Sequence, residues 1–144
     1  YQVAVAKSRF GALMPTTKTL ADAAEIVYLA NGNFGGDISQ MDVDIPAGCT
    51  LGGTLSVAVC PNNVVFDVFD SGTPNITGIN KQVNLGYVIW LKNSAHPGER
   101  RCLALSTDKV ANNVCKSMGG TVVTGESYDY FTKLIGAPTV YALE

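Results

Sequence analysis

The side chains that could do chemistry in this sequence are few and lie far apart. His96 is the only histidine. A general base at this position would need a nucleophile and an orienting acid close by. Its neighbours, Ser94, Ala95, Pro97 and Gly98, are instead typical of a solvated turn. No motif supplies a nucleophile, a base and an acid together, so the sequence predicts that the protein is not an enzyme.

A second group of side chains could offer oxygen ligands to Ca²⁺. Asp67 and Asp70 are followed by Asn75 and Asn80, but their spacing matches no EF-hand loop. We expect these residues in surface turns, and the sequence predicts neither a metal nor a cofactor. The triplet Asn75-Ile76-Thr77 has the form of an N-glycosylation acceptor, a pattern too common to indicate glycosylation on its own.

Four cysteines, without the spacing of a metal site, indicate two disulfides in an oxidising compartment, with four buried free thiols as the alternative. A bridge between Cys102 and Cys115 would stabilise the folded protein by roughly 3 kcal/mol, because closing this loop lowers the conformational entropy of the unfolded chain. Cys49 and Cys60 would form the other pair. A tight hairpin turning at residues 52–53 would hold them too far apart to bond, so residues 49–53 are expected to form a loop rather than a paired strand.

The elements that must position these side chains begin with a helix over residues 1–31. Its apolar residues recur at alternating steps of three and four, which is the pattern of one helix face. Polar residues between them predict an amphipathic helix that ends at Gly32. At about 45 Å it would be longer than a domain of this mass is wide, so part of it should project. The face expected to pack on a sheet includes Phe10, Leu13, Leu20, Ala24 and Val27.

Strand patterns follow the helix. Alternating β-branched and aromatic residues predict strands at 54–60, 64–69, 85–91 and 101–105, whereas turn-forming residues predict loops at 33–53 and 70–80. A short helix should start at Thr107 or Asp108 and end at Gly119. The tail could add edge strands around 122–123 and 128–131. Residues 142–144 resemble the scar left before a purification tag and are excluded from the fold.

These elements predict one two-layer α+β domain. Four strands joined by short links favour an antiparallel meander, and the apolar face of the long helix can cover it. The expected fold is therefore a long N-terminal helix on a four-stranded antiparallel sheet, with a short helix after the fourth strand. Residues 1–32 form the helix, 33–141 form a globular head, and 142–144 lie outside both.

The balance of charge in the chain argues against some classes of partner. The chain carries 10 Lys and Arg against 12 Asp and Glu, a net charge of −2, and its basic residues are dispersed. This balance argues against a general electrostatic grip on nucleic acid or on an anionic membrane. No nucleic-acid partner is predicted. No run of 18 apolar residues is present either.

Two stretches of the sequence resemble bacterial type IV pilins. Ala6-Lys7-Ser8-Arg9 and Tyr28-Leu29-Ala30-Asn31-Gly32 are similar to the pilin helix just beyond its hydrophobic N-terminal segment. The stretch from Arg101 to Gly120 is similar to the cysteine-bounded region near the C-terminus of many such pilins. The resemblance implies a type IV pilin-like fold, and it favours the pairs Cys49 with Cys60 and Cys102 with Cys115.

The resemblance also implies a function. The chain would be the soluble head domain of a pilin, a monomer by itself, whose apolar N-terminal half-helix is missing here and sits in the inner membrane before assembly. The full-length protein would polymerise through this helix into a homo-oligomeric extracellular filament for adhesion, twitching motility or DNA uptake. The alternatives are a pseudopilin of a type II secretion system, in which calcium would bind a loop, and a minor pilin that binds DNA.

Overall fold

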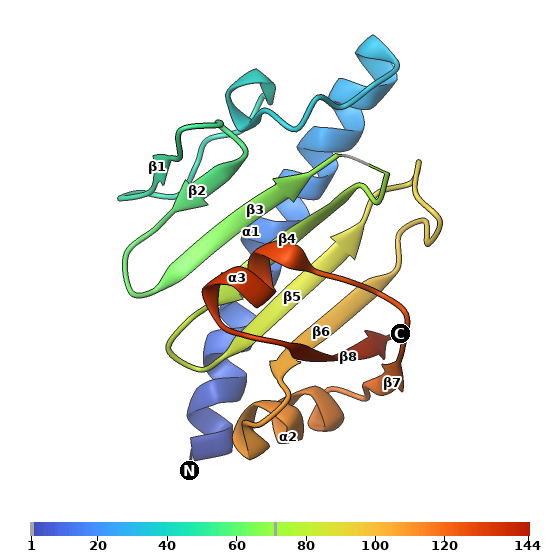
Figure 1. Cartoon of the computed structure of the whole chain (residues 1–144). Helices are drawn as coiled ribbons and strands as arrows, with labels where there is room; N and C mark the ends of the chain where they lie inside the picture. Colours follow the sequence, from blue (N-terminus) through green and yellow to red (C-terminus); the bar gives the residue numbers. More distant parts are fainter. Residues whose placement is uncertain (1, 71) are drawn as a thin grey trace.

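A long helix, α1, lies across one face of an antiparallel sheet in the computed structural model of the protein, which describes residues 2–70 and 72–144 (Figure 1). α1 spans Gln2–Asn31 and continues through Pro15. The chain leaves the helix at Gly32, whose φ of 77° is the left-handed conformation that glycine adopts readily. Tyr1 and Ser71, which the sequence places in the helix and in a loop, lie outside the described residues.

The sheet has eight strands in the order β1-β2-β3-β4-β5-β6-β8-β7, and every neighbouring pair is antiparallel. The predicted four-stranded sheet is therefore wrong, and this is a different α+β arrangement. The strands are β1 (Thr50–Leu51), β2 (Val57–Val59), β3 (Val64–Phe69), β4 (Asn75–Asn80), β5 (Leu85–Trp90), β6 (Arg100–Leu105), β7 (Thr121–Val123) and β8 (Pro138–Leu143).

The strand β4 corrects the predicted loop over residues 70–80. Its sequence, Asn-Ile-Thr-Gly-Ile-Asn, is rich in residues that usually form turns. All six residues are nevertheless buried, because β4 pairs with β3 on one side and β5 on the other and lies beneath α1. Burial between two partner strands and a helix has outweighed local propensity.

The C-terminal part of the chain differs from expectation at two places. Residues 128–131, predicted as an edge strand, belong instead to the helix α3 (Asp129–Leu134) and its N-cap. Residues 142 and 143, excluded as a scar, are part of β8, which pairs along its whole length with β6. The edge strand expected around residues 122–123 is present as β7.

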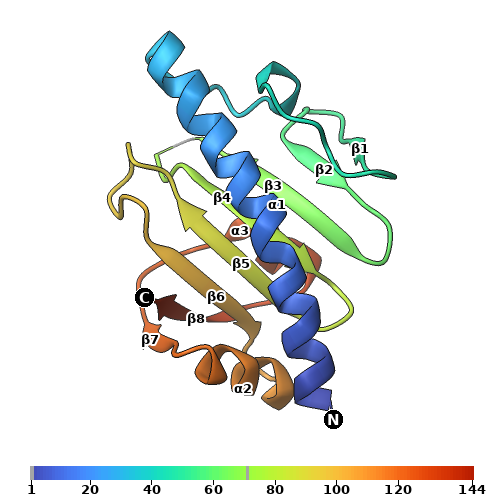
Figure 2. The same cartoon turned by 180° about the vertical axis from the view of Figure 1, so that it is seen from behind.

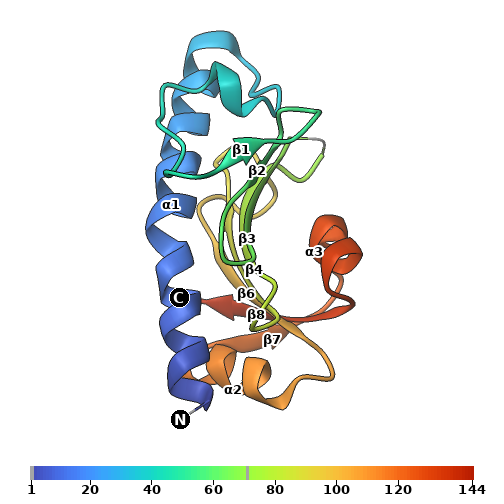
Figure 3. The same ribbon diagram turned by 90° about the vertical axis from the view of Figure 1, so that its left-hand side faces the viewer.

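Each face of the sheet carries a hydrophobic core, and Figure 3 shows α1 and α3 on its opposite sides. The helix α2 (Lys109–Ser117) lies beside the N-terminal end of α1, whereas the other end of α1 projects past the strands (Figure 2). A 3₁₀ turn, η1 (Ile38–Gln40), follows α1. Of the helix residues expected to face the sheet, Phe10, Leu13, Leu20 and Ala24 are buried and Val27 is half-buried against the same core.

The two disulfides join Cys49 to Cys60 and Cys102 to Cys115. β1 pairs with β2 in a register that places Cys49 opposite Cys60, with their Cα atoms 4.0 Å apart. The chain turns over residues 52–56 rather than at 52–53, and residues 50–51 are paired, so the expectation that 49–53 form an unpaired loop is wrong. The second disulfide links β6 to α2.

Candidate functional site

One row of exposed residues along α1 is the first candidate site, because it carries little charge. Residues spaced three or four apart on the side away from the sheet are small or apolar, apart from Asp22, which pairs with Lys18 one turn earlier. This exposed face comprises Ala4, Ser8, Ala12, Pro15, Thr19, Asp22, Ile26 and Leu29, whereas Lys7 and Lys18 are also exposed on the helix but lie outside this row. The predicted polar face is thus only partly polar.

Two large aliphatic side chains stand out on this face. Ile26 is 62% exposed and Leu29 is 83% exposed, and both belong to the last two turns of α1. This end of the helix projects past the strands (Figure 2). A single exposed aliphatic residue needs no explanation, but two neighbours on the same helix face, one turn apart, form an apolar patch. The helix therefore presents an apolar surface that no part of the described chain covers.

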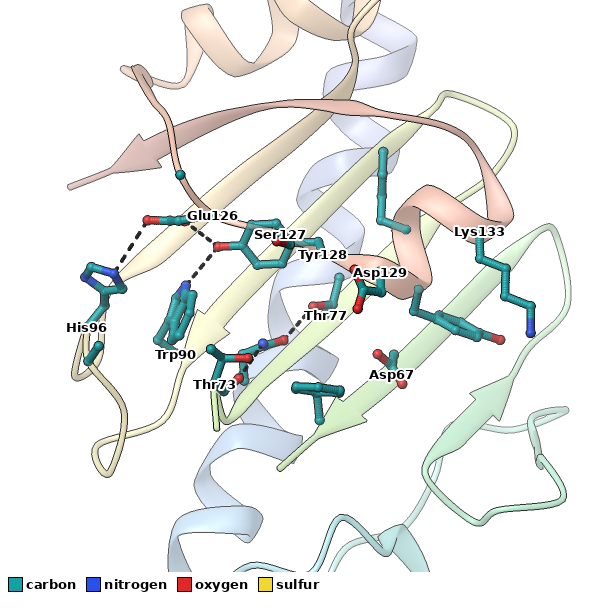
Figure 4. Close-up of a pocket in the computed structure, with 16 residues that line it drawn as sticks. Asp67, Thr73, Thr77, Trp90, His96, Glu126, Ser127, Tyr128, Asp129 and Lys133 are labelled. Atoms are coloured by element: carbon teal, nitrogen blue, oxygen red, sulfur yellow. Dashed lines mark hydrogen bonds and ion pairs between the residues drawn. The ribbon is translucent and has the colours of Figure 1, made fainter. Parts of the chain in front are cut away.

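The second candidate site is a pocket of about 540 Å³ on the opposite face of the sheet. Its floor is formed by side chains of β3, β4 and β5, and its wall by the segment from residue 125 to α3 (Figure 4). Successive side chains of a strand point to opposite faces. Phe66 and Val68 therefore join the core under α1, whereas Asp67 and Phe69 reach the pocket.

One wall of the pocket is held by a buried ion pair. Arg101, 3% exposed, donates two hydrogen bonds of 2.9 and 3.0 Å from Nε and Nη2 to the carboxylate of Glu126. Burial would raise the pKa of Glu126, but hydrogen bonds from Arg101 and Tyr128 outweigh it, so the pKa is lowered. The segment that carries Glu126 is thereby fixed over the sheet.

The aromatic groups beside this pair are also hydrogen-bonded. Tyr128 donates its hydroxyl proton to Glu126 at 2.6 Å and accepts a bond of 3.0 Å from the indole nitrogen of Trp90 (Figure 4). Burial, followed by the bond to Glu126, raises the pKa of Tyr128, so it stays a phenol. The ring of His96 packs edge-on against that of Trp90, and its Nε2 lies 3.7 Å from Oε2 of Glu126. It is thus a partly buried member of this wall rather than a freely solvated turn residue.

Asp67 is the most perturbed acid of the pocket. Burial raises its pKa to about 6, and a backbone hydrogen bond from Val68 opposes the shift only in part. Among the ion pairs of residues 2–70 and 72–144, none includes Asp67. Tyr130 of α3 lies close enough for burial and the charge of Asp67 to raise its own pKa. The sequence pattern indicated Asp67 only as a possible calcium ligand.

The structure separates the residues that the sequence suggests as oxygen ligands for Ca²⁺. Asp70 is exposed beyond the end of β3, whereas Asn75 and Asn80 are buried at opposite ends of β4. Across the described residues, no group of three or more His, Cys, Asp or Glu side chains is placed to hold a metal ion. In the glycosylation triplet, the side-chain nitrogen of Asn75 donates to the Thr73 carbonyl at 2.8 Å, and Asn75 is only 5% exposed.

Comparison with protein-family models, with curated proteins and with solved structures finds no match to this chain. None of the helices in residues 2–70 and 72–144 combines the length and the apolar character that a membrane crossing requires.

Proposed function

We propose that the protein is the structural subunit of a bacterial type IV pilus, which polymerises through its N-terminal helix into an extracellular filament. Before assembly, the globular part would face the periplasm while the protein is attached to the inner membrane. The observation that carries the proposal is the apolar patch of Ile26 and Leu29 on the solvent face of α1. The resemblance of α1 and of the stretch from Arg101 to Gly120 to pilins points the same way.

The shape of this surface favours assembly with copies of the same chain. Small side chains along most of the exposed face of α1 allow another element to approach closely, and the exposed aliphatic pair lies at one end of that face. A contact between this face and a different surface of the next copy is heterologous and does not close, so it extends into a filament. A filament subunit needs no catalytic group, because its function would depend on the contacts between subunits.

The experiment replaces both patch residues by aspartate in the full-length protein, produced in a cell that displays the filaments. The double variant I26D/L29D should lower the amount of surface filament seen by electron microscopy about tenfold or more, because a buried unpaired carboxylate opposes each subunit contact. Val122 is a matched control, since it is 54% exposed and aliphatic but lies on β7 rather than on α1. V122D should leave the amount of surface filament unchanged.

Folding is checked on the 144-residue chain itself. I26D/L29D should change its melting temperature little, since substitutions at exposed positions usually alter stability by about 0.5 kcal/mol or less. Normal filament yield from the full-length double variant would refute assembly through this face of α1.

A further inference from the structure

The helix α3 lies on the face of the sheet away from α1 (Figure 3). The pocket that α3 helps to line is therefore separate from the surface proposed for assembly. Its volume of about 540 Å³ lies within the range of sites that hold a small molecule. Aromatic side chains contribute much of its lining, with Phe69 rising from the floor and Tyr130 from the wall. The question is which ligand chemistry the polar groups select.

Several polar groups of the pocket already have partners within the protein. Asn75 donates to the Thr73 carbonyl and accepts from the Thr77 hydroxyl, while Glu126 is engaged by Arg101 and by Tyr128 (Figure 4). A sugar needs many free donors and acceptors around its hydroxyl groups, because each unmatched polar group loses its bonds to water. These side chains do not offer such a set.

Asp67 is the exception at the floor of the pocket. It pairs across the sheet with Thr77 on β4 and Val57 on β2, neither of which carries a charge. Lys133 is the cation that α3 contributes to the pocket lining, but no ion pair joins it to Asp67 among the described residues. An acid held partly out of water without a counter-charge is a feature of binding sites.

We propose that this pocket binds a small organic cation, an amidinium or primary ammonium group attached to a flat apolar body. The charged group would be held by Asp67 and the apolar body would lie against Phe69 and Tyr130. Phe69 is 37% exposed and Tyr130 is half-buried, so both rings can be reached by a ligand. A cation gains from the carboxylate through a charge-assisted hydrogen bond and from the aromatic faces through cation–π attraction.

The test compares two probes that differ in charge and hardly in shape. Benzamidine carries an amidinium group, whereas benzamide is its neutral counterpart. In an NMR titration of the 144-residue chain at pH 7.5, benzamidine should shift the signals of Phe69, Tyr130 and Thr77 and should bind about tenfold or more tightly than benzamide. Equal affinity of the two probes, or shifts that map to another surface, would overturn the proposal.

The variant D67N removes the charge while it keeps the shape of the side chain. It should reduce the affinity for benzamidine about tenfold or more, to that for benzamide. Because the substitution removes a buried charge, the melting temperature should not fall, so that loss of binding cannot be ascribed to unfolding. Asp44, an exposed acid in the loop before β1, is the control, and D44N should bind benzamidine as the parent chain does.

A third probe separates the cation from a sugar. Maltose, which is neutral, should leave the pocket signals unchanged. Shifts of the pocket signals with maltose that persist in D67N would show a saccharide site and would overturn the proposal. Failure of all three probes to bind would equally overturn the proposal of a cation site. It would not bear on filament assembly through α1, which is tested separately by the variant I26D/L29D.

Discussion

Asp67 lies in a row of β3 side chains whose other members, Val65 and Phe69, are apolar. Burial raises its pKa to about 6, whereas an aspartate in an unfolded chain titrates near pH 3.9. The folded protein therefore binds a proton at pH 5 that the unfolded chain has already lost. By linkage, the carboxyl group does not weaken the fold below about pH 4, and stability falls as the pH rises from about 4 to about 6.

The variant D67N should therefore be more stable than the parent chain at neutral pH. The shift of about two units corresponds to an increase of about 1–3 kcal/mol in the free energy of unfolding at pH 7, with solvent access reducing the upper value. At pH 3.5 most of the gain should be lost, since the carboxyl group is then mostly protonated in both states. Urea unfolding of both proteins at the two pH values measures this, and an equal gain at pH 3.5 would show that charge is not the cause.

At the scale of elements, the contact between α1 and β4 depends on one glycine. A Cβ atom at Gly78 would lie 2.6 Å from the hydroxyl oxygen of Thr17 on α1 and 3.0 Å from the Phe66 ring. Thr17 is itself fully buried and donates to the Leu13 carbonyl, so it cannot simply turn away. The absence of a side chain at Gly78 is what lets the helix lie this close to the sheet.

The substitution Gly78→Ala should consequently destabilise the protein by about 1–3 kcal/mol, through overpacking between α1 and β4. Gly53 is a matched control, because a Cβ there meets no atom within 4 Å and its φ is not in the left-handed region. Gly53→Ala should change stability by less than about 1 kcal/mol. Thermal unfolding of the two variants makes the comparison, and equal effects would contradict the close approach of helix and sheet.

These elements were predictable from sequence to different degrees. Long α1 and the alternating strands β3, β5 and β6 follow from patterns within single stretches. β4 does not, because its residues favour turns and become a strand only between β3 and β5. Tyr128 to Phe131 has the aromatic content of a strand, yet it caps and begins α3, where Phe131 packs into the second core.

The pocket could not be predicted, because its residues come from four separate stretches of the chain. Asp67 and Trp90 are 23 positions apart, and Glu126 follows a further 36 positions later. The partners Arg101 and Glu126 are likewise separated by 25 residues. The one available signal was an acid in an apolar strand row at Asp67. Tertiary packing decides which elements cover that row, and local sequence patterns do not report tertiary packing.

At the scale of the whole molecule, burial decreases from the centre of the sheet towards its edges. Every residue of β4 and β5 is buried, whereas the edge strands β1 and β7 are short and partly exposed. Regions with few buried contacts open at lower free energy than the core. The two disulfides sample these two environments, because Cys49 and Cys60 are half-buried beside the β1 edge while Cys102 and Cys115 are 0% exposed.

Mild reduction of the native protein should therefore break the disulfides in a fixed order. The bond between Cys49 and Cys60 should react first, about tenfold faster or more, because a thiol reagent reaches it through local opening of the edge, whereas the bond between Cys102 and Cys115 requires the core to open. Timed alkylation and mass spectrometry of the cysteine peptides give the two rates. Reduction of Cys102 with Cys115 first, or of both bonds together, would show that the edge and the centre open as one unit.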